Sequence, residues 1–153
     1  MALTKVQSEM AGAGQVLQVV NATSVTQVST SSSTYADSGL TASITPKSST
    51  SKILVIVDLN GITKDSNNTS GGFKLLRNST DLMVLDHFIG YTNSTANLGP
   101  GGVGCNYLDS PATTSTTTYK VQLKSMNNNG TIYLNNAGYG NITSTITLME
   151  VAQ

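Results

Sequence analysis

The sequence contains no tryptophan, a single cysteine and few charged residues, and each shortage excludes a class of protein. Charged residues make up 10% of the 153 positions, whereas about a quarter is typical of soluble proteins. Eight basic residues balance eight acidic ones, so no net charge attracts the chain to nucleic acid or to an anionic membrane. The lone Cys105 excludes an internal disulfide framework and a thiolate zinc cluster. We therefore expect no nucleic-acid partner and no membrane partner.

Long apolar segments and export signals are lacking as well. No segment approaches the roughly 18 apolar residues of a membrane span, and no apolar region follows Lys5 as it would in a secretory signal. Hydrophobic residues nevertheless make up 38% of the chain, which favours folding over disorder when the net charge is zero. We expect one folded domain, made in a cytoplasm without an export signal of its own.

The segment Lys52–Asn60 is the most continuously apolar part of the sequence. It is too short for a core helix, and Ile53, Val55, Ile56 and Val57 are β-branched, which favours an extended conformation. We therefore predict a central strand that is covered on both faces.

Alternating apolar and polar residues predict further strands on both sides of this segment. The predicted strands are Val16 to Asn21, Ser24 to Ser29, Leu40 to Thr45, Phe73 to Arg77, Leu82 to Ile89, Cys105 to Leu108, Tyr119 to Lys124, Thr131 to Asn135 and Ser144 to Val151, with loops over Lys64 to Gly72 and Tyr91 to Gly104. No helices are available for parallel crossovers. The pattern predicts an all-β fold: an antiparallel β-sandwich, jelly-roll-like, with about eight to ten strands. An immunoglobulin-like sandwich is the alternative.

The first 14 residues differ from the rest, because Leu3, Val6 and Met10 follow a helical spacing before Gly12 and Gly14. A segment this short is marginal on its own and gains stability by packing on another surface. We therefore divide the chain into an N-terminal attachment arm (1–14) and a β-sandwich domain (15–153), and we assign attachment to Leu3, Val6 and Met10.

Four segments carry a resemblance to a known family. They are Gly14-Gln-Val-Leu-Gln-Val-Val, Thr45-Pro-Lys-Ser-Ser-Thr-Ser-Lys-Ile-Leu-Val, Tyr107-Leu-Asp-Ser-Pro-Ala-Thr-Thr-Ser-Thr-Thr-Thr-Tyr-Lys-Val-Gln and Ser144-Thr-Ile-Thr-Leu-Met-Glu-Val-Ala. Together they resemble a family of phage virion surface proteins, similar to the tail fibre and structural proteins of phages that infect aquatic bacteria. The stretch from Leu108 to Gln122 is the most specific part.

The resemblance implies a non-enzymatic homotrimer on the exterior of the virion, made in the host cytoplasm. Because only about 14 residues precede the β domain, we favour a head decoration or cement protein bound to the major capsid protein. The alternative is a tail-fibre or receptor-binding tip protein, which would contact a tail or baseplate protein and a host-surface glycan. For glycan contact, the available aromatic platforms are Tyr91, Tyr133 and Tyr139; core or subunit-interface positions are the other reading of these tyrosines.

Three motifs superficially suggest chemistry. Asp86-His87 pairs a carboxylate with an imidazole, but neighbours on a strand point to opposite faces. Gly99 to Gly104 matches G-x-G-x-x-G, yet Pro100 interrupts it and a β-rich segment follows instead of a helix. Asp65-Ser-Asn-Asn-Thr offers oxygen ligands without the glycine and glutamate of a calcium loop. We therefore expect no catalytic, cofactor-binding or metal residues.

Overall fold

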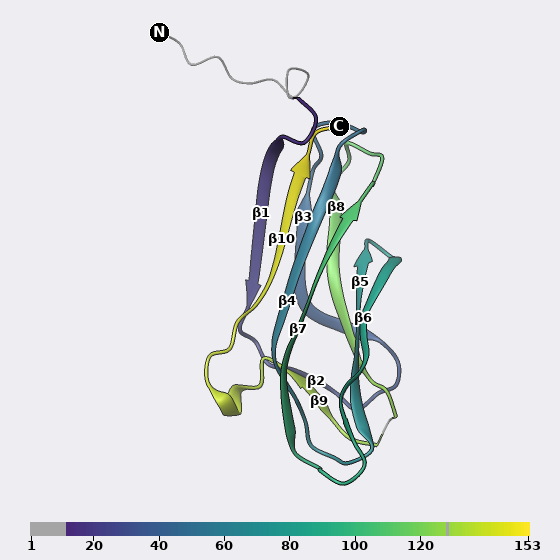
Figure 1. The fold of residues 1–153 in the computed structure, drawn as a ribbon, viewed down its shortest axis with the longest axis vertical. Coiled ribbons are helices and arrows are strands. Elements are labelled where there is room, and N and C mark those ends of the chain that lie inside the picture. The colour runs from purple at the N-terminus through teal and green to yellow at the C-terminus, as the bar shows by residue number, and fades with distance from the viewer. Residues whose placement is uncertain (1–11, 128) are drawn as a thin grey trace.

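The computed structural model describes residues 12–127 and 129–153, and within these ranges it contains ten strands, all paired antiparallel (Figure 1). The strands are β1 (Val16–Ser24), β2 (Val28–Thr30), β3 (Ala36–Ile44), β4 (Lys52–Lys64), β5 (Thr69–Arg77), β6 (Thr80–Thr92), β7 (Leu98–Asp109), β8 (Thr117–Ser125), β9 (Ile132–Leu134) and β10 (Ser144–Val151), and a short 3-10 helix, η2 (Ala137–Tyr139), precedes β10. In the described part of the chain, no helix has the length and apolar content needed to cross a membrane. The prediction of an all-β antiparallel fold is confirmed.

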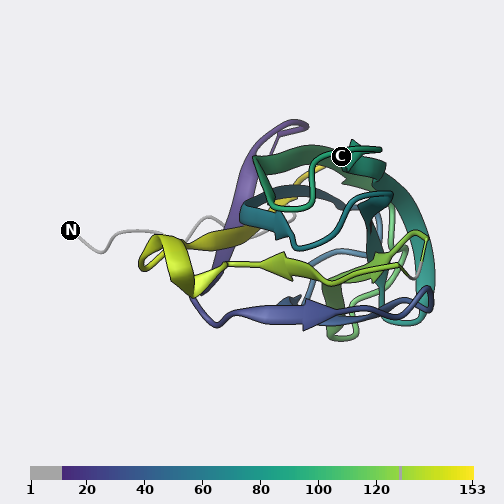
Figure 2. The same ribbon diagram turned by 90° about the horizontal axis from the view of Figure 1, so that it is seen from below.

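The strands form two sheets that face each other. The first sheet has the order β1-β10-β4-β9-β2, with β7 paired to the other edge of β4, and the second has the order β3-β8-β5-β6. The chain crosses between the sheets after most strands, as in a jelly roll. Seen from below in Figure 2, β2 and β9 lie side by side at one end of the molecule, while Figure 1 shows the C-terminus at the other end.

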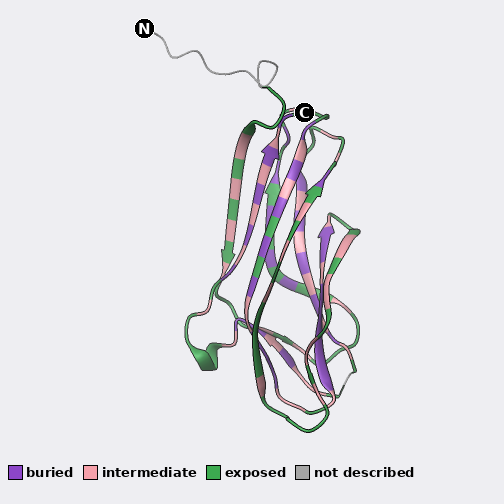
Figure 3. Cartoon of the chain, in the orientation of Figure 1, coloured by how far each residue is buried: buried purple, intermediate pink, exposed green. Residues whose placement is uncertain are grey.

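The core lies between the two sheets and follows from strict alternation along the strands. In β8 every second residue, from Thr117 to Ser125, is buried, and β10 alternates in the same way from Ser144 (Figure 3). Each buried aliphatic or aromatic side chain contributes roughly 1.5–3 kcal/mol. The fully buried core side chains include Leu40, Ile53, Val55, Leu59, Phe73, Leu75, Tyr119, Val121, Leu123, Leu134, Ile146 and Leu148.

β4 is central to the first sheet, but it is covered on one face only. Val55 and Val57 are fully buried against the second sheet, whereas Leu54 is half-buried and Ile56 is 40% exposed. The prediction of cover on both faces is therefore wrong. An uninterrupted apolar run need not mean two buried faces, because a strand in a two-layer sandwich has only one face toward the core.

The boundaries of three predicted segments also differ from the structure. Gly99 to Gly104 lies within β7 and not in a loop, β5 begins at Thr69, and the predicted strand Ser24 to Ser29 is interrupted between β1 and β2. The glycines suit a strand here because β7 approaches β4 closely. A Cβ atom added at Gly102 would lie 2.4 Å from the carbonyl oxygen of Leu59.

Candidate functional site

An apolar row crosses the outer face of the first sheet, on the side away from the core. The register pairs Val19 of β1 with Met149 of β10, Met149 with Leu54 of β4, and Leu54 with Leu108 of β7. Directly paired residues in an antiparallel sheet project from the same face. Four adjacent strands therefore place four apolar side chains in one line across this face.

Two members of this row, Val19 and Leu108, are exposed large apolar residues, and the other two, Leu54 and Met149, are half-buried. Val19 is 55% exposed and Leu108 is 51% exposed, and Ile56 lies two residues from Leu54 on the same face of β4. We call Val19, Leu54, Ile56, Leu108 and Met149 the outer patch. A contiguous apolar patch on a soluble protein marks an interaction surface more often than scattered single residues do.

Polar residues border the outer patch along the strands. Asn21 lies beyond Val19 on β1, and its amide donates a 2.8 Å hydrogen bond to the Thr147 hydroxyl of β10. On β4, Lys52 and Asp58 project from the same face at either end of Leu54 and Ile56. An apolar centre with a polar border is the usual anatomy of a protein interface.

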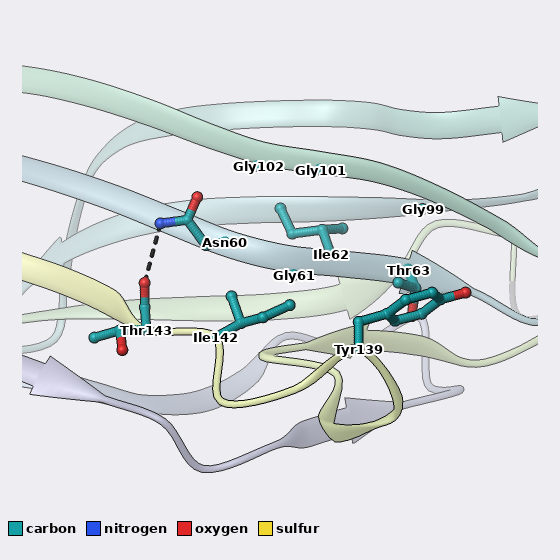
Figure 4. Close-up of a pocket in the computed structure, with 10 residues that line it drawn as sticks. All are labelled: Asn60, Gly61, Ile62, Thr63, Gly99, Gly101, Gly102, Tyr139, Ile142 and Thr143. Atoms are coloured by element: carbon teal, nitrogen blue, oxygen red, sulfur yellow. Dashed lines mark hydrogen bonds between the residues drawn. The ribbon is translucent and has the colours of Figure 1, made fainter.

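A groove lies farther along the same outer face, at the end of β4 where β10 no longer pairs with it (Figure 4). Its volume is about 660 Å³. Three segments line it: β4 from Asn60 to Thr63, β7 with Gly99, Gly101 and Gly102, and the segment after β9 with Tyr139, Ile142 and Thr143.

The local geometry of the groove depends on the turn of β4 at Gly61. This glycine has a φ of +63°, a conformation that other residues rarely adopt. A Cβ atom at Gly61 would lie 2.9 Å from Cδ1 of Ile142, whose side chain points toward Gly61 in Figure 4. The Asn136 backbone N–H donates to the Gly61 carbonyl at 3.1 Å and ties the segment after β9 to β4.

One buried carboxylate, Asp109, has a structural role. Arg77 donates to both of its oxygens at 2.9 Å, and the Tyr119 hydroxyl donates to it at 2.6 Å. Burial, followed by the hydrogen bond to Asp109, raises the pKa of Tyr119 well above its ordinary value. This trio joins β7 to β5 and β8 across one end of the sandwich.

Glu150 and Asp65 are similarly tied to the backbone. Glu150 is fully buried and accepts hydrogen bonds from the Gln18 amide at 2.6 Å and the Lys47 backbone N–H at 2.7 Å. Burial alone would raise its pKa, but these hydrogen bonds lower the pKa overall. Asp65 accepts from the Thr131 N–H at 2.7 Å, and its pKa is lowered for the same reason, against the effect of burial.

The residues predicted for attachment, Leu3, Val6 and Met10, lie outside the described residues. Among the chemical motifs, Asp86 accepts a hydrogen bond from the Phe88 backbone N–H at 2.7 Å, and His87 is exposed on β6. Within the described ranges, no group of three or more His, Cys, Asp and Glu side chains suits a metal ion. Cys105 packs against the core, and burial raises the pKa of its thiol.

The three candidate tyrosines lie in different surroundings. Tyr91 contacts Phe88 edge-to-face, with the ring centroids 6.2 Å apart. The Tyr133 hydroxyl donates to Asp65 at 3.3 Å. Tyr139 is 69% exposed and lines the groove. Only Tyr139 thus combines high exposure with a concave surface.

The outer patch was missed by the sequence reasoning, although a signal existed. Leu54 and Ile56 alternate with Ile53, Val55 and Val57, so β4 carries apolar side chains on both faces. In a two-layer sandwich only one of these faces can point toward the core. The pairing partners Val19, Leu108 and Met149 are far from β4 in sequence, and their register is a tertiary property.

Comparison with known proteins adds little to this description. No family model and no curated protein sequence matches the chain. Among solved structures, the chain is similar to the infectious bursal disease virus VP2 subviral particle, at 12% sequence identity and a TM-score of 0.45. That similarity covers 89% of this chain and 37% of the VP2 chain, so the present chain spans well under half of its length. A similarity this distant does not define a function.

Proposed function

We propose that the chain is a non-enzymatic structural protein of a bacteriophage virion, displayed on the particle exterior as a homotrimer. The outer patch is the surface through which the copies associate. Its favoured location is the phage head, where the protein acts as a decoration or cement protein on the major capsid protein.

The observation that carries this proposal is where the four residues of the apolar row lie in the sequence. Val19, Leu54, Leu108 and Met149 each belong to a different one of the four segments that resemble phage virion surface proteins. Those segments are distant in sequence, and the sheet register aligns one residue from each. Each segment that carries the resemblance therefore contributes one residue to the candidate association surface.

The chemistry of this face supports association with further copies. The side chains of the row are uncharged, so covering them removes apolar surface from water without desolvating an ion, at roughly 25 cal/mol per Å². The neighbouring Asn21 and Thr147 side chains already share one hydrogen bond, which lowers the cost of removing them from water. The number of copies, three, comes from the resemblance.

The non-enzymatic part of the proposal is supported by the state of the carboxylates. Asp65, Asp109 and Glu150 each accept two or more hydrogen bonds that hold strands or loops together. General acid–base catalysis needs a carboxylate or imidazole within reach of a substrate. These three carboxylates are instead committed to the fold.

Imaging tests the location. A copy of the chain carrying a small electron-dense label is incorporated into virions, and the label is expected over the head surface. A label along the tail would establish the tail-fibre alternative, in which the partners are a tail or baseplate protein. Virions that carry the label on neither structure would contradict the virion role.

A further inference from the structure

The groove beside Tyr139 is separate from the surface assigned to association. Along β4, Ile56 is the outer-patch residue nearest the groove, and Asn60 lies four residues beyond it, which is about 13 Å at 3.3 Å per strand residue. The polar residues Asp58 and Thr145, which pair in register, lie between the two regions. The groove therefore needs an explanation of its own.

The walls of the groove combine apolar and hydrogen-bonding groups. Tyr139 and Ile142 supply apolar surface, and Figure 4 shows the Tyr139 ring beside Thr63 at one end. None of the ten described residues that line the groove carries a charged side chain. The volume of about 660 Å³ falls within the range of small-molecule sites, roughly 300–1,000 Å³.

The amide of Asn60 is held in a fixed orientation. Its nitrogen donates to the Thr143 carbonyl at 3.0 Å and to a carboxylate oxygen of Asp58 at 3.2 Å. Its carbonyl oxygen consequently turns toward β7, where a Cβ atom added at Gly102 would lie 2.8 Å from it. An oriented amide oxygen in a concave site is an acceptor for a ligand hydroxyl.

The glycines of β7 keep the groove open. A Cβ atom at Gly101 would meet nothing within 4 Å, and one at Gly99 would meet only Cγ2 of Thr63, at 3.6 Å. A side chain at either position would therefore project into free space at the groove. Gly101 has a φ of +101°, which strains other residues, whereas no such strain applies at Gly99.

We propose that this groove binds a neutral glycan, with a pyranose ring against Tyr139 and Ile142 and its hydroxyls bonded to Asn60 and Thr143. A sugar ring presents apolar C–H groups on its faces and hydroxyls at its edge, which matches these walls. A purely apolar ligand would remove water from the Asn60 oxygen without offering it a hydrogen-bond donor, which is unfavourable. The inference goes beyond the structural role and gives the tail-fibre alternative's glycan partner a defined site.

Calorimetry and saturation-transfer NMR on the full chain test the proposal. The probes are maltose, lactose, cellobiose and N,N′-diacetylchitobiose, with sialyllactose as a charged comparison. At least one neutral probe is expected to bind saturably at millimolar concentration and to receive magnetisation on its ring protons. If none of the neutral probes binds, the proposal is wrong.

Two variants locate the binding. Tyr139→Ala removes the exposed ring, and Gly99→Leu fills the groove without backbone strain; each is expected to weaken binding at least about tenfold. Tyr91→Ala is the matched control, because it removes a partly exposed tyrosine outside the groove. Equal weakening by Tyr91→Ala, or unchanged binding by both groove variants, would overturn the assignment.

The oligomeric state of each variant is measured by light scattering in the same samples. If Tyr139→Ala abolished association, the groove would be part of the contact between copies, and the glycan proposal would be overturned. If sugar binding failed while the wild-type chain remained a trimer, the glycan proposal would be wrong and the proposed structural function would be unaffected.

Discussion

Both faces of β4 carry apolar side chains, but the two faces have different surroundings. Val55 and Val57 point toward the second sheet and are fully buried, whereas Leu54 and Ile56, one residue away, point outward and remain partly exposed. The same strand therefore supplies side chains to two surfaces. The inner surface provides the folding energy of the domain, and the outer surface is available to a partner.

The borders of the two faces differ as well. Glu150 lies on the inner face near the C-terminal end of β10, where it is fully buried and accepts hydrogen bonds from Gln18 and Lys47. The outer face has Asn21 and Thr147 beside its apolar row, bonded to each other. The inner face thus holds a fully buried charge, whereas the polar border of the outer face, which includes Lys52 and Asp58, stays accessible to water. Substitutions on the two faces should have separable effects.

The largest expected effect is on the inner face. Val55→Asp places an unpaired carboxylate in a fully buried site, which costs several kcal/mol against a total stability of roughly 5–15 kcal/mol. We expect the variant to be insoluble or unfolded by circular dichroism. A soluble Val55→Asp protein with an unchanged melting curve would show that this face is not the core.

An intermediate effect is expected for the buried carboxylate Glu150. Glu150→Gln keeps the size of the side chain but removes the charge from its hydrogen bonds, each of which is worth about 1.5–3 kcal/mol when charged. We expect the urea midpoint to fall at pH 7 while the variant still associates. A midpoint equal to that of the wild type would exclude a stabilising role for this charge.

The pH dependence follows from the same group. The folded-state pKa of Glu150 lies below its ordinary value of 4.5, so the folded chain binds its proton more weakly than the unfolded chain. Its contribution to stability is present above pH 4.5 and is lost as the pH falls through the lower folded-state pKa. Asp65 acts in the same direction. As the pH is lowered below 4.5, the free energy of unfolding of the wild type should therefore fall more than that of Glu150→Gln.

The smallest effect on folding is expected from removal of the arm. A chain that begins at Gln15 keeps all ten described strands. It also keeps the pairing of β1 with β10, in which Val16 lies opposite Val151. We expect it to melt as the full chain does and to remain a trimer, but to lose attachment to virions, because Leu3, Val6 and Met10 are gone. Attachment to particles lacking the native copy, measured by co-sedimentation, is the readout; equal attachment by both chains would show that the β domain carries the anchor.

Much of the fold could be predicted from local pattern. β8 and β10 have strict alternation, and the predicted strand Ser144 to Val151 agrees with β10 in both bounds. The glycine-rich start of β7 could not be predicted, because its strand conformation depends on the close approach of Gly102 to Leu59. The groove could not be predicted either, since Asn60 and Tyr139 come to line one groove only through the tertiary fold. Tyr139 was among the candidates, but its surroundings were not predictable.

The central claim, that the outer face joins copies of the chain, is tested most directly by the mass in solution of two matched variants. Val19 and Val84 are both exposed valines on strands, 55% and 46% exposed, but Val19 is in the outer patch and Val84 is on β6 of the second sheet. Either substitution to Glu should change monomer stability by no more than about 0.5 kcal/mol. Sedimentation equilibrium at micromolar concentration should give a trimer for the wild type and for Val84→Glu, and a folded monomer for Val19→Glu. A wild-type monomer, or a Val19→Glu protein that remains trimeric, would contradict the account.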